Sequence, residues 1–388
     1  MQRKLFIPAL ESMKKIREES GQLNDELPIA QLGTTYVMAQ ASCWVSIDKF
    51  LVGRWDGSLS IFEKTSSATQ GAEITIASSA PSDQGIQMVT WVAENTFATS
   101  NDDSSIAIWQ ASDSTFENVM VKQIVAYESS FGIANSAQIF PYNGANYLVS
   151  GHESGFLLIF EGTLEGDGFS LVNKVDLTSS TPTNPWNLQN IRGVAFYDFN
   201  GVPYAITGSE NGLISVVRIP DGSVMSQMVY NPDAQRGINA ISIYGGGLIV
   251  GNCSVGPDDK NFWFYGVEPE ANWSIKLYDS ANLVVDNSRQ QVFNFCVTWG
   301  WFETTPCWYA ATEEGVLWMG TISSNREIQV TGYQNVAAAD LGAALAATTT
   351  DLSYVAYNVC SFSTNPSGKY DAGSNPNFPN STDVADLF

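Results

Sequence analysis

Short hydrophobic segments recur along most of the chain, and turns rich in glycine, asparagine or acidic residues separate them. The clearest repeat covers residues 50–63, where the apolar run Phe-Leu-Val-Gly precedes the turn Asp56-Gly57 and a second apolar run that ends in an aromatic residue. Glycine and asparagine adopt positive φ at little cost, so such turns join two strands into a β-hairpin. The same arrangement returns at residues 96–110, 147–161, 204–217 and 308–319.

Each hairpin is flanked by two further segments typical of strands. An apolar segment precedes it, as residues 88–92 precede the second hairpin, and a more polar segment follows, as residues 119–124 do. The pattern therefore predicts units of four antiparallel strands, with an apolar inner strand and a polar outer strand. The other predicted inner strands are residues 136–140, 191–196, 238–243 and 293–299, and the other outer strands are 73–76, 169–175, 224–228 and 327–330.

The units recur about every fifty residues, a period typical of β-propeller blades. One hairpin cannot bury its apolar face alone, whereas four-stranded sheets packed around a common axis can. Six units are clear; the fifth begins at residues 247–252 and is expected to resume at 273–279. Residues 343–357 form a weaker seventh unit, with residues 34–38 as its closing outer strand. We therefore predict an all-β fold, a seven-bladed β-propeller.

The third strands of these units resemble those of the WD-repeat family. The resemblance rests on Ser-Ile-Phe-Glu at 60–63, Ala-Ile-Trp-Gln at 107–110, Leu-Ile-Phe-Glu at 158–161 and Ile-Lys-Leu-Tyr-Asp at 275–279. No unit opens with Gly-His and no Trp-Asp pair closes a third strand, so the Ser/Thr–His–Asp–Trp hydrogen-bond network of standard repeats is not expected. The chain is thus predicted to be a divergent member or another class of propeller. The resemblance implies a scaffold that binds protein partners, alone or in a large assembly.

The two ends of the chain differ from the repeats, which divides it into three predicted parts. Residues 1–27 form an N-terminal helical arm, in which residues 8–20 read as a short helix with Pro8 in its first turn. Residues 28–360 form the propeller. Residues 361–388, rich in Ser, Asn, Pro and Gly, are expected to be a flexible tail.

Charge narrows the class of partner. The chain has 18 Lys plus Arg against 40 Asp plus Glu, a formal net charge of −22. Such a surface repels phosphate backbones and anionic membranes, so nucleic-acid binding is not expected. No stretch approaches the roughly 20 apolar residues of a membrane span, and the N-terminal apolar run is too short for a signal peptide. The five cysteines have no zinc-site spacing, which favours buried thiols in a cytoplasmic protein.

The sequence gives little support for catalysis. His152 is the one histidine, which excludes a multi-histidine metal site and makes a Ser–His–Asp triad depend on this residue alone. The segment Gly151-His152-Glu153-Ser154-Gly155 places its serine one position late for a nucleophile elbow and lies at a hairpin turn. We therefore predict no enzyme activity, no catalytic or metal-binding residue and no cofactor.

Two long segments are the candidate binding site. Residues 254–272 are interpreted as an insertion between a second and a third strand, and residues 178–190 as a loop between neighbouring units on the same face. Aromatic anchors and acidic neighbours in them would form one binding surface. The alternative is that the aromatics cover a small core of the insertion itself. The candidate residues are Trp186, Asp258, Asp259, Phe262, Trp263, Phe264, Tyr265 and Glu268.

These features predict a non-catalytic protein-interaction scaffold that presents an aromatic, acidic loop face. A carbohydrate-binding, lectin-like propeller is the main alternative, because Trp and Tyr stack on sugars and carboxylates accept hydrogen bonds from hydroxyls. A propeller hydrolase or lactonase that uses carboxylates near the axis is the weaker alternative.

Overall fold

The computed structural model describes residues 39–44, 49–54, 57, 59–63, 72–75, 85–101, 103–164, 168–182, 187–231, 237–254, 259–284, 292–302, 305–312 and 316–335. The predicted N-terminal arm (1–27), the seventh unit (343–357), its closing strand (34–38) and the tail (361–388) lie outside the described residues. Both predicted boundaries of the propeller, 28 and 360, lie outside them as well.

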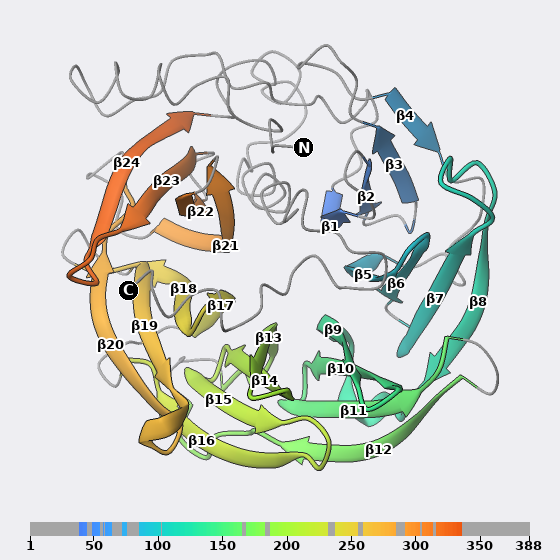
Figure 1. Cartoon of the computed structure of the whole chain (residues 1–388), viewed down its shortest axis with the longest axis horizontal. Coiled ribbons are helices and arrows are strands. Elements are labelled where there is room, and N and C mark those ends of the chain that lie inside the picture. The colour runs from blue at the N-terminus through green and yellow to red at the C-terminus, as the bar shows by residue number, and fades with distance from the viewer. Residues whose placement is uncertain are drawn as a thin grey trace.

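Within the described ranges the chain forms successive groups of four antiparallel strands, each in chain order (Figure 1). We number these groups as sheets one to six. Sheets one to three are β1 (Ala39–Trp44), β2 (Lys49–Arg54), β3 (Leu59–Glu63), β4 (Ala72–Thr75); β5 (Ile86–Ala93), β6 (Thr96–Asn101), β7 (Ser105–Ala111), β8 (Val119–Ala126); and β9 (Ala134–Tyr142), β10 (Ala145–His152), β11 (Phe156–Gly162), β12 (Phe169–Asp176).

Sheets four to six follow the same plan. They are β13 (Ile191–Phe199), β14 (Val202–Ser209), β15 (Leu213–Arg218), β16 (Ser223–Val229); β17 (Ile238–Tyr244), β18 (Gly247–Ser254), β19 (Phe262–Glu268), β20 (Ser274–Ala281); and β21 (Val292–Phe302), β22 (Thr305–Thr312), β23 (Val316–Ile322), β24 (Ile328–Asn335). Sheets five and six are joined, because the end of β18 pairs with the start of β21 through Cys253↔Phe293 and Ser254↔Val292.

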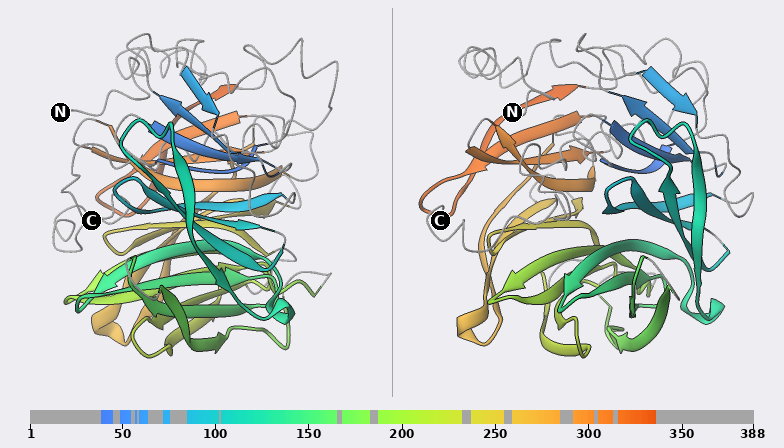
Figure 2. Two further views of the ribbon diagram at one scale, coloured as in Figure 1. Left: turned by 90° about the vertical axis from the view of Figure 1, so that its right-hand side faces the viewer. Right: turned by 45° about the vertical axis from the view of Figure 1, so that its right-hand side comes forward.

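The sheets follow one another around a central axis (Figure 1). The first strands β1, β5, β9, β13, β17 and β21 lie nearest this axis, and each contacts the next in that order. The side views show successive sheets packed face against face (Figure 2). A sector between sheet six and sheet one holds none of the described strands. The described part is thus all-β and consistent with a propeller.

Helical structure within the described ranges is limited to two 3-10 turns, η1 (Ser129–Phe131) and η2 (Pro269–Ala271). No helix in this part of the chain has the length and apolar character needed to cross a bilayer.

The hydrophobic core lies in the seams between adjacent sheets. The cluster between sheets two and three, for example, joins Met88 and Ile108 of sheet two to Ala137 and Leu158 of sheet three. Second and third strands are covered on both faces, so β6 is buried throughout, whereas the outer strand β8 is mostly exposed. This gradient confirms the predicted order of apolar inner strands and polar outer strands.

Most strand predictions are confirmed. The hairpin turns near Asp103, Ser154 and Asn211 fall between the second and third strands of a sheet, whereas Asp56 and Glu314 lie outside the described residues. The fifth unit is the exception: of residues 273–279, predicted as a third strand, 274–279 belong to the outer strand β20, and the third strand is β19. The four-strand plan holds there, but the segment 254–272 contains a strand of the sheet instead of being a loop insertion.

A repeated close contact brings each sheet against the next. The second strands of sheets one, three and four carry Gly53, Gly151 and Gly208 near their ends, and each faces an isoleucine of the following sheet. A Cβ built on Gly208 would lie 2.5 Å from Ile241 Cγ2 and 2.8 Å from Ile238 Cγ2. These separations are shorter than any non-bonded carbon–carbon contact, so these three seams close only because the second strand has no side chain at that position.

In sheet two a serine occupies the corresponding position. Ser100 pairs with the start of the third strand as the glycines do, and its hydroxyl donates a hydrogen bond to the backbone oxygen of Ala134 in sheet three. Hydroxyl groups also link first strands: Ser136 Oγ accepts from Val194 N (2.9 Å) and Ser242 Oγ accepts from Trp299 N (3.2 Å). The seams therefore combine close apolar packing with a few direct hydrogen bonds.

We predict that Gly208→Ala destabilises the fold by about 1–3 kcal/mol, because the new methyl group overpacks the seam between sheets four and five. Urea unfolding measures the change. In the double variant Gly208→Ala/Ile241→Ala the loss should be smaller than the sum of the two single losses, since removing the Ile241 methyl groups makes room. Additive losses would show that the contact does not limit the seam.

Candidate functional site

The four consecutive aromatics of the predicted binding surface lie inside the fold. Phe262, Trp263, Phe264 and Tyr265 begin β19, which pairs with β18 on one side and β20 on the other. None exposes more than 8% of its surface. The prediction that these aromatics form an exposed loop surface is therefore wrong.

Their burial has a simple cause. Trp263 and Tyr265 belong to the core between sheets four and five, whereas Phe262 and Phe264 belong to the core between sheets five and six. Alternate side chains of a strand point to opposite faces, and this middle strand is covered on both. An unbroken aromatic run is therefore the pattern of a doubly covered strand, as in other strands buried on both faces.

The remaining predicted residues do not converge with these four. Asp259 is exposed before β19, and Glu268 is half-buried at its end. Trp186 and Asp258 lie outside the described residues. Of the predicted set, Phe264 and Glu268 line a recess, as shown below.

Two buried tryptophans make hydrogen bonds that the sequence did not predict. Trp109 Nε1 donates to Thr99 Oγ1 (3.0 Å), and this hydroxyl donates to Asn101 Oδ1 (3.3 Å). A tryptophan–threonine bond between third and second strands thus forms without a histidine or an aspartate. In sheet five Trp263 Nε1 donates instead to Asn252 Oδ1 (2.9 Å). Both bonds fix ring orientation inside the seams.

His152 is also a structural residue. Its side chain is fully buried at the end of β10, with Tyr127 against its edge at 4.6 Å between ring centroids. Nδ1 lies 3.2 Å from the Gly132 carbonyl oxygen, which can only accept, so Nδ1 carries the proton and Nε2 accepts from Ser150 Oγ at 2.8 Å. Burial lowers the pKa of His152 to about 4, and the hydrogen bond to Gly132 opposes the shift. The imidazole is therefore neutral at pH 7.

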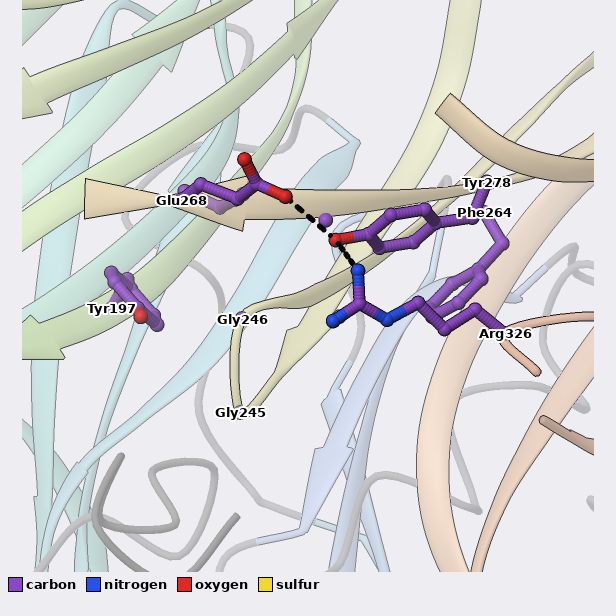
Figure 3. A pocket seen from close by; sticks show the side chains of 10 residues that line it. Tyr197, Gly245, Gly246, Phe264, Glu268, Tyr278 and Arg326 are labelled. Atoms are coloured by element: carbon purple, nitrogen blue, oxygen red, sulfur yellow. Dashed lines mark hydrogen bonds between the residues drawn. The ribbon is translucent and has the colours of Figure 1, made fainter. Parts of the chain in front are cut away.

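A recess of about 210 Å³ opens where sheets four, five and six meet (Figure 3). The Gly245-Gly246-Gly247 turn between β17 and β18 forms one wall, and both Gly245 and Gly246 have positive φ. The remaining lining comes from Tyr197 of β13, residues of β19, Tyr278 of β20 and Arg326 in the turn between β23 and β24. The lining residues are Tyr197, Gly245, Gly246, Gly247, Phe264, Gly266, Val267, Glu268, Tyr278 and Arg326.

Two opposite charges meet on one tyrosine in this recess. The Tyr278 hydroxyl donates to Glu268 Oε1 (2.9 Å) and accepts from Arg326 Nη1 (2.5 Å), as the dashed lines in Figure 3 show. The Arg326 guanidinium also lies 4.4 Å from the centre of the Tyr278 ring, within cation–π range. Partial burial and the hydrogen bond to Glu268 raise the pKa of Tyr278.

The sequence contained one signal for this recess, the run of three glycines at 245–247. A turn that needs two consecutive positive φ values and lets a ligand approach the backbone would use such a run. Nothing in the sequence indicated that Arg326 lines this recess, because it lies in a turn of the next sheet, far along the chain from the glycines. Elsewhere in the described ranges, no three His, Cys, Asp or Glu side chains converge as a metal ion would require.

A second surface feature is the outer strand β8. Met120 exposes 70% of its surface, Ile124 53% and Val121 37%, and Lys122 between them is exposed as well. The other outer strands with exposed large apolar residues, β12, β16, β20 and β24, have one each among the described residues. An apolar cluster on a sheet edge is a typical feature of an interaction site.

Comparison with known proteins supports the fold and no specific activity. No protein-family model matches the chain, and no curated protein matches it. A chain of the solved structure described as "Crystal Structure of Mitotic Checkpoint Complex" is similar, with a TM-score of 0.52 and 12% sequence identity over 78% of this chain and 80% of that chain. At this low identity the similarity supports the fold alone, which is consistent with a β-propeller. Because 1538 chains of solved structures match, the fold by itself does not select a function.

We predict a specific acid sensitivity from His152. The unfolded histidine has a pKa of 6.5 and the folded one about 4, so the unfolded chain binds a proton first as the pH falls. Stability from this residue is complete above pH 6.5 and is lost between pH 6.5 and 4, by about 3 kcal/mol in total.

Urea unfolding of the wild type and of His152→Gln, at pH 7 and pH 4.5, measures this effect. Carboxylates titrate equally in both proteins, and His152 is the only histidine. The stability difference between wild type and variant should therefore shift against the wild type at pH 4.5 by about 2–3 kcal/mol. A difference that does not change with pH would mean that the histidine keeps its ordinary pKa.

Proposed function

We propose that this chain is a non-catalytic protein-interaction scaffold built on a seven-bladed, WD-repeat-like propeller. The observation that carries the proposal is the exposed apolar cluster Met120, Val121 and Ile124 on the outer strand β8. Burying large apolar side chains on binding is favourable by roughly 25 cal/mol per Å² of apolar surface. Such a cluster on a soluble protein is best explained by a partner that covers it.

The strand edge indicates the form of this partner. β8 is the last strand of sheet two and pairs with β7 along one edge only, so its other edge pairs with no described strand. An extended segment can add to such an edge through backbone hydrogen bonds. Exposed Lys122 lies among the apolar residues, which favours a segment with an acidic residue flanked by apolar ones. We propose this type of segment as the partner element.

The comparison supports the scaffold by analogy. The similar chain belongs to a structure described as a mitotic checkpoint complex, and a complex consists of associated chains. The analogy concerns the use of the fold for protein association and not the identity of the partner.

The complete ring is part of the proposal. Six sheets follow one another around the axis, and the sector between sheet six and sheet one holds no described strand. Residues 343–357 together with residues 34–38 have the sequence pattern of the unit that would fill it. A closed ring removes two exposed sheet faces, which is the physical reason for closure.

The carbohydrate alternative loses its main support, because the four aromatics expected to stack on sugars are buried. A glycan array with the full chain tests it directly. We also propose no cofactor, no catalytic residue and no nucleic-acid partner; the net charge of −22 opposes the last.

We predict that Met120→Glu/Ile124→Glu abolishes partner binding at β8. A phage-displayed peptide library selected on the immobilised full chain should enrich extended segments that alternate apolar and acidic residues. Affinity of the enriched peptides, measured by biolayer interferometry, should fall at least tenfold in the double variant. Val172→Glu on β12 is the matched control, because Val172 is an exposed apolar residue (43%) on another outer strand.

The control variant should bind like the wild type. Equal binding to all three proteins would place the interaction elsewhere, and failure to enrich any peptide would contradict a docking edge. Thermal unfolding of each variant checks that the fold is retained.

A further inference from the structure

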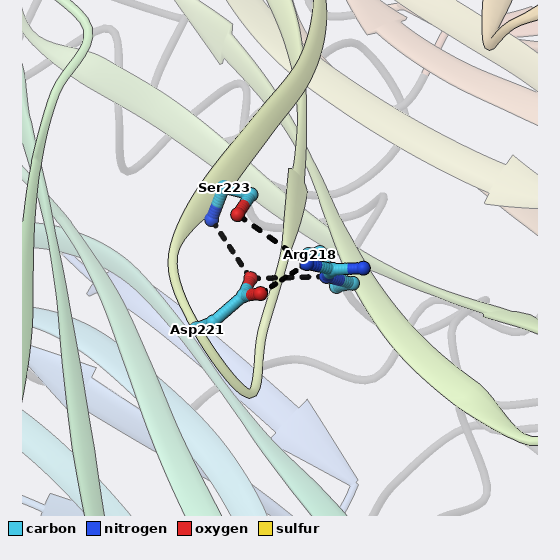
Figure 4. Close-up of polar contacts among 3 residues, drawn as sticks. All are labelled: Arg218, Asp221 and Ser223. Atoms are coloured by element: carbon cyan, nitrogen blue, oxygen red, sulfur yellow. Dashed lines mark hydrogen bonds and ion pairs between the residues drawn. The ribbon is translucent and has the colours of Figure 1, made fainter.

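The recess where sheets four, five and six meet contains an arginine of sheet six that differs from its counterpart in sheet four. Arg218 and Arg326 lie at the turns between the third and fourth strands of their sheets. Arg218 is paired within its own turn: its guanidinium donates from Nε and Nη2 to the two carboxylate oxygens of Asp221, beside Ser223 (Figure 4). The turn of Arg326 also carries a carboxylate, Glu327, but no ion pair joins the two among the described residues, and Arg326 extends over Tyr278 instead.

Arg326 keeps most of its hydrogen-bonding capacity. A guanidinium has five N–H donors, and the described contacts of Arg326 use one of them, on the Tyr278 hydroxyl. Its side chain is half-buried beside the recess, and it forms no ion pair with a carboxylate of the described residues. The planar guanidinium is suited to a carboxylate, which it binds with two parallel hydrogen bonds.

Glu268 supplies the opposite charge on the same side of the recess. Its carboxylate accepts one described hydrogen bond, from Tyr278, whereas a carboxylate can accept about four. Because the Tyr278 hydroxyl contacts both Glu268 Oε1 and Arg326 Nη1, the two charged groups are separated by no more than two hydrogen-bond lengths. A ligand that satisfies both must carry a cation and an anion close together.

From this geometry we infer that the recess binds a free α-amino acid. Its ammonium and carboxylate are both attached to Cα, two covalent bonds from each other, which matches the close pair of protein charges. The carboxylate pairs with Arg326, the ammonium pairs with Glu268, and the Tyr278 hydroxyl lies between them. The Gly245–Gly247 turn allows the Cα of the ligand to approach the protein backbone, because no side chain projects from it.

Size and net charge favour the same class of ligand. The recess of about 210 Å³ is smaller than the roughly 300–1,000 Å³ typical of sites for drug-sized ligands, so nucleotides and oligosaccharides are too large. A chain with a net charge of −22 repels simple anions, and Arg326 repels simple cations. A zwitterion has no net charge and avoids both repulsions. This inference goes beyond the scaffold function and does not depend on the β8 edge.

Isothermal titration calorimetry of the full chain with each of the twenty L-amino acids tests the inference. The amino acid that binds most tightly is then compared with its N-acetyl derivative, which lacks the ammonium, and its amide, which lacks the carboxylate. We expect each derivative to bind at least tenfold more weakly than the free amino acid. Equal binding of either derivative, or no heat of binding with any amino acid at millimolar concentration, would overturn the proposal.

Variants locate the site. Arg326→Gln and Glu268→Gln should each weaken binding at least tenfold, while Arg218→Gln, the matched turn arginine paired with Asp221, should leave it unchanged. Tyr278→Phe should weaken binding less, because both charges remain. Thermal unfolding confirms that each variant is folded; binding that survives in folded Arg326→Gln and Glu268→Gln would exclude this recess.

Discussion

The close approach of adjacent sheets is the constraint on which the structure depends. Sheets arranged around an axis are nearest to one another beside it and diverge toward the rim. Glycine on the second strand lets an isoleucine of the following sheet enter the narrow part of the seam, as Gly53 does for Ile86 and Gly151 for Ile191. Larger side chains of the third strands, such as Trp109 and Tyr265, fill the wider part. The small residues at these positions therefore determine how closely adjacent sheets approach.

Turn chemistry made most of this fold predictable. Asp56-Gly57 and the corresponding sequences mark the hairpins. They can be recognised from the sequence because glycine and asparagine readily adopt the positive φ that such turns require. The fifth sheet was misread because its third strand, Phe262–Glu268, has no alternation of apolar and polar residues. Apolar and polar residues alternate only in a strand with one exposed face, and this strand is buried on both faces. The segment 273–279 then matched the third-strand pattern although it is an outer strand.

The candidate recess could not be predicted from the sequence for a different reason. Glu268, Tyr278 and Arg326 are brought together by two sheets, and the hydrogen bonds that join them depend on the register between those sheets. The net negative charge of the chain also does not describe the charge at this site. Lys276 and Arg326 both lie near the ring of Tyr278. The net charge of the chain excludes classes of partner, but it does not locate the few places where basic residues gather on an otherwise acidic protein.

The pairing of β18 with β21 gives sheets five and six a mechanical property of their own. At one end of β18 the two sheets share a backbone ladder at Cys253 and Ser254; at its other end Trp299 of β21 donates a hydrogen bond to the Gly247 carbonyl (3.0 Å). Because these contacts lie at opposite ends of β18, they restrict rotation of the two sheets relative to each other. The walls of the recess are thereby held at a fixed separation before anything enters it, so occupancy requires little ordering of the protein.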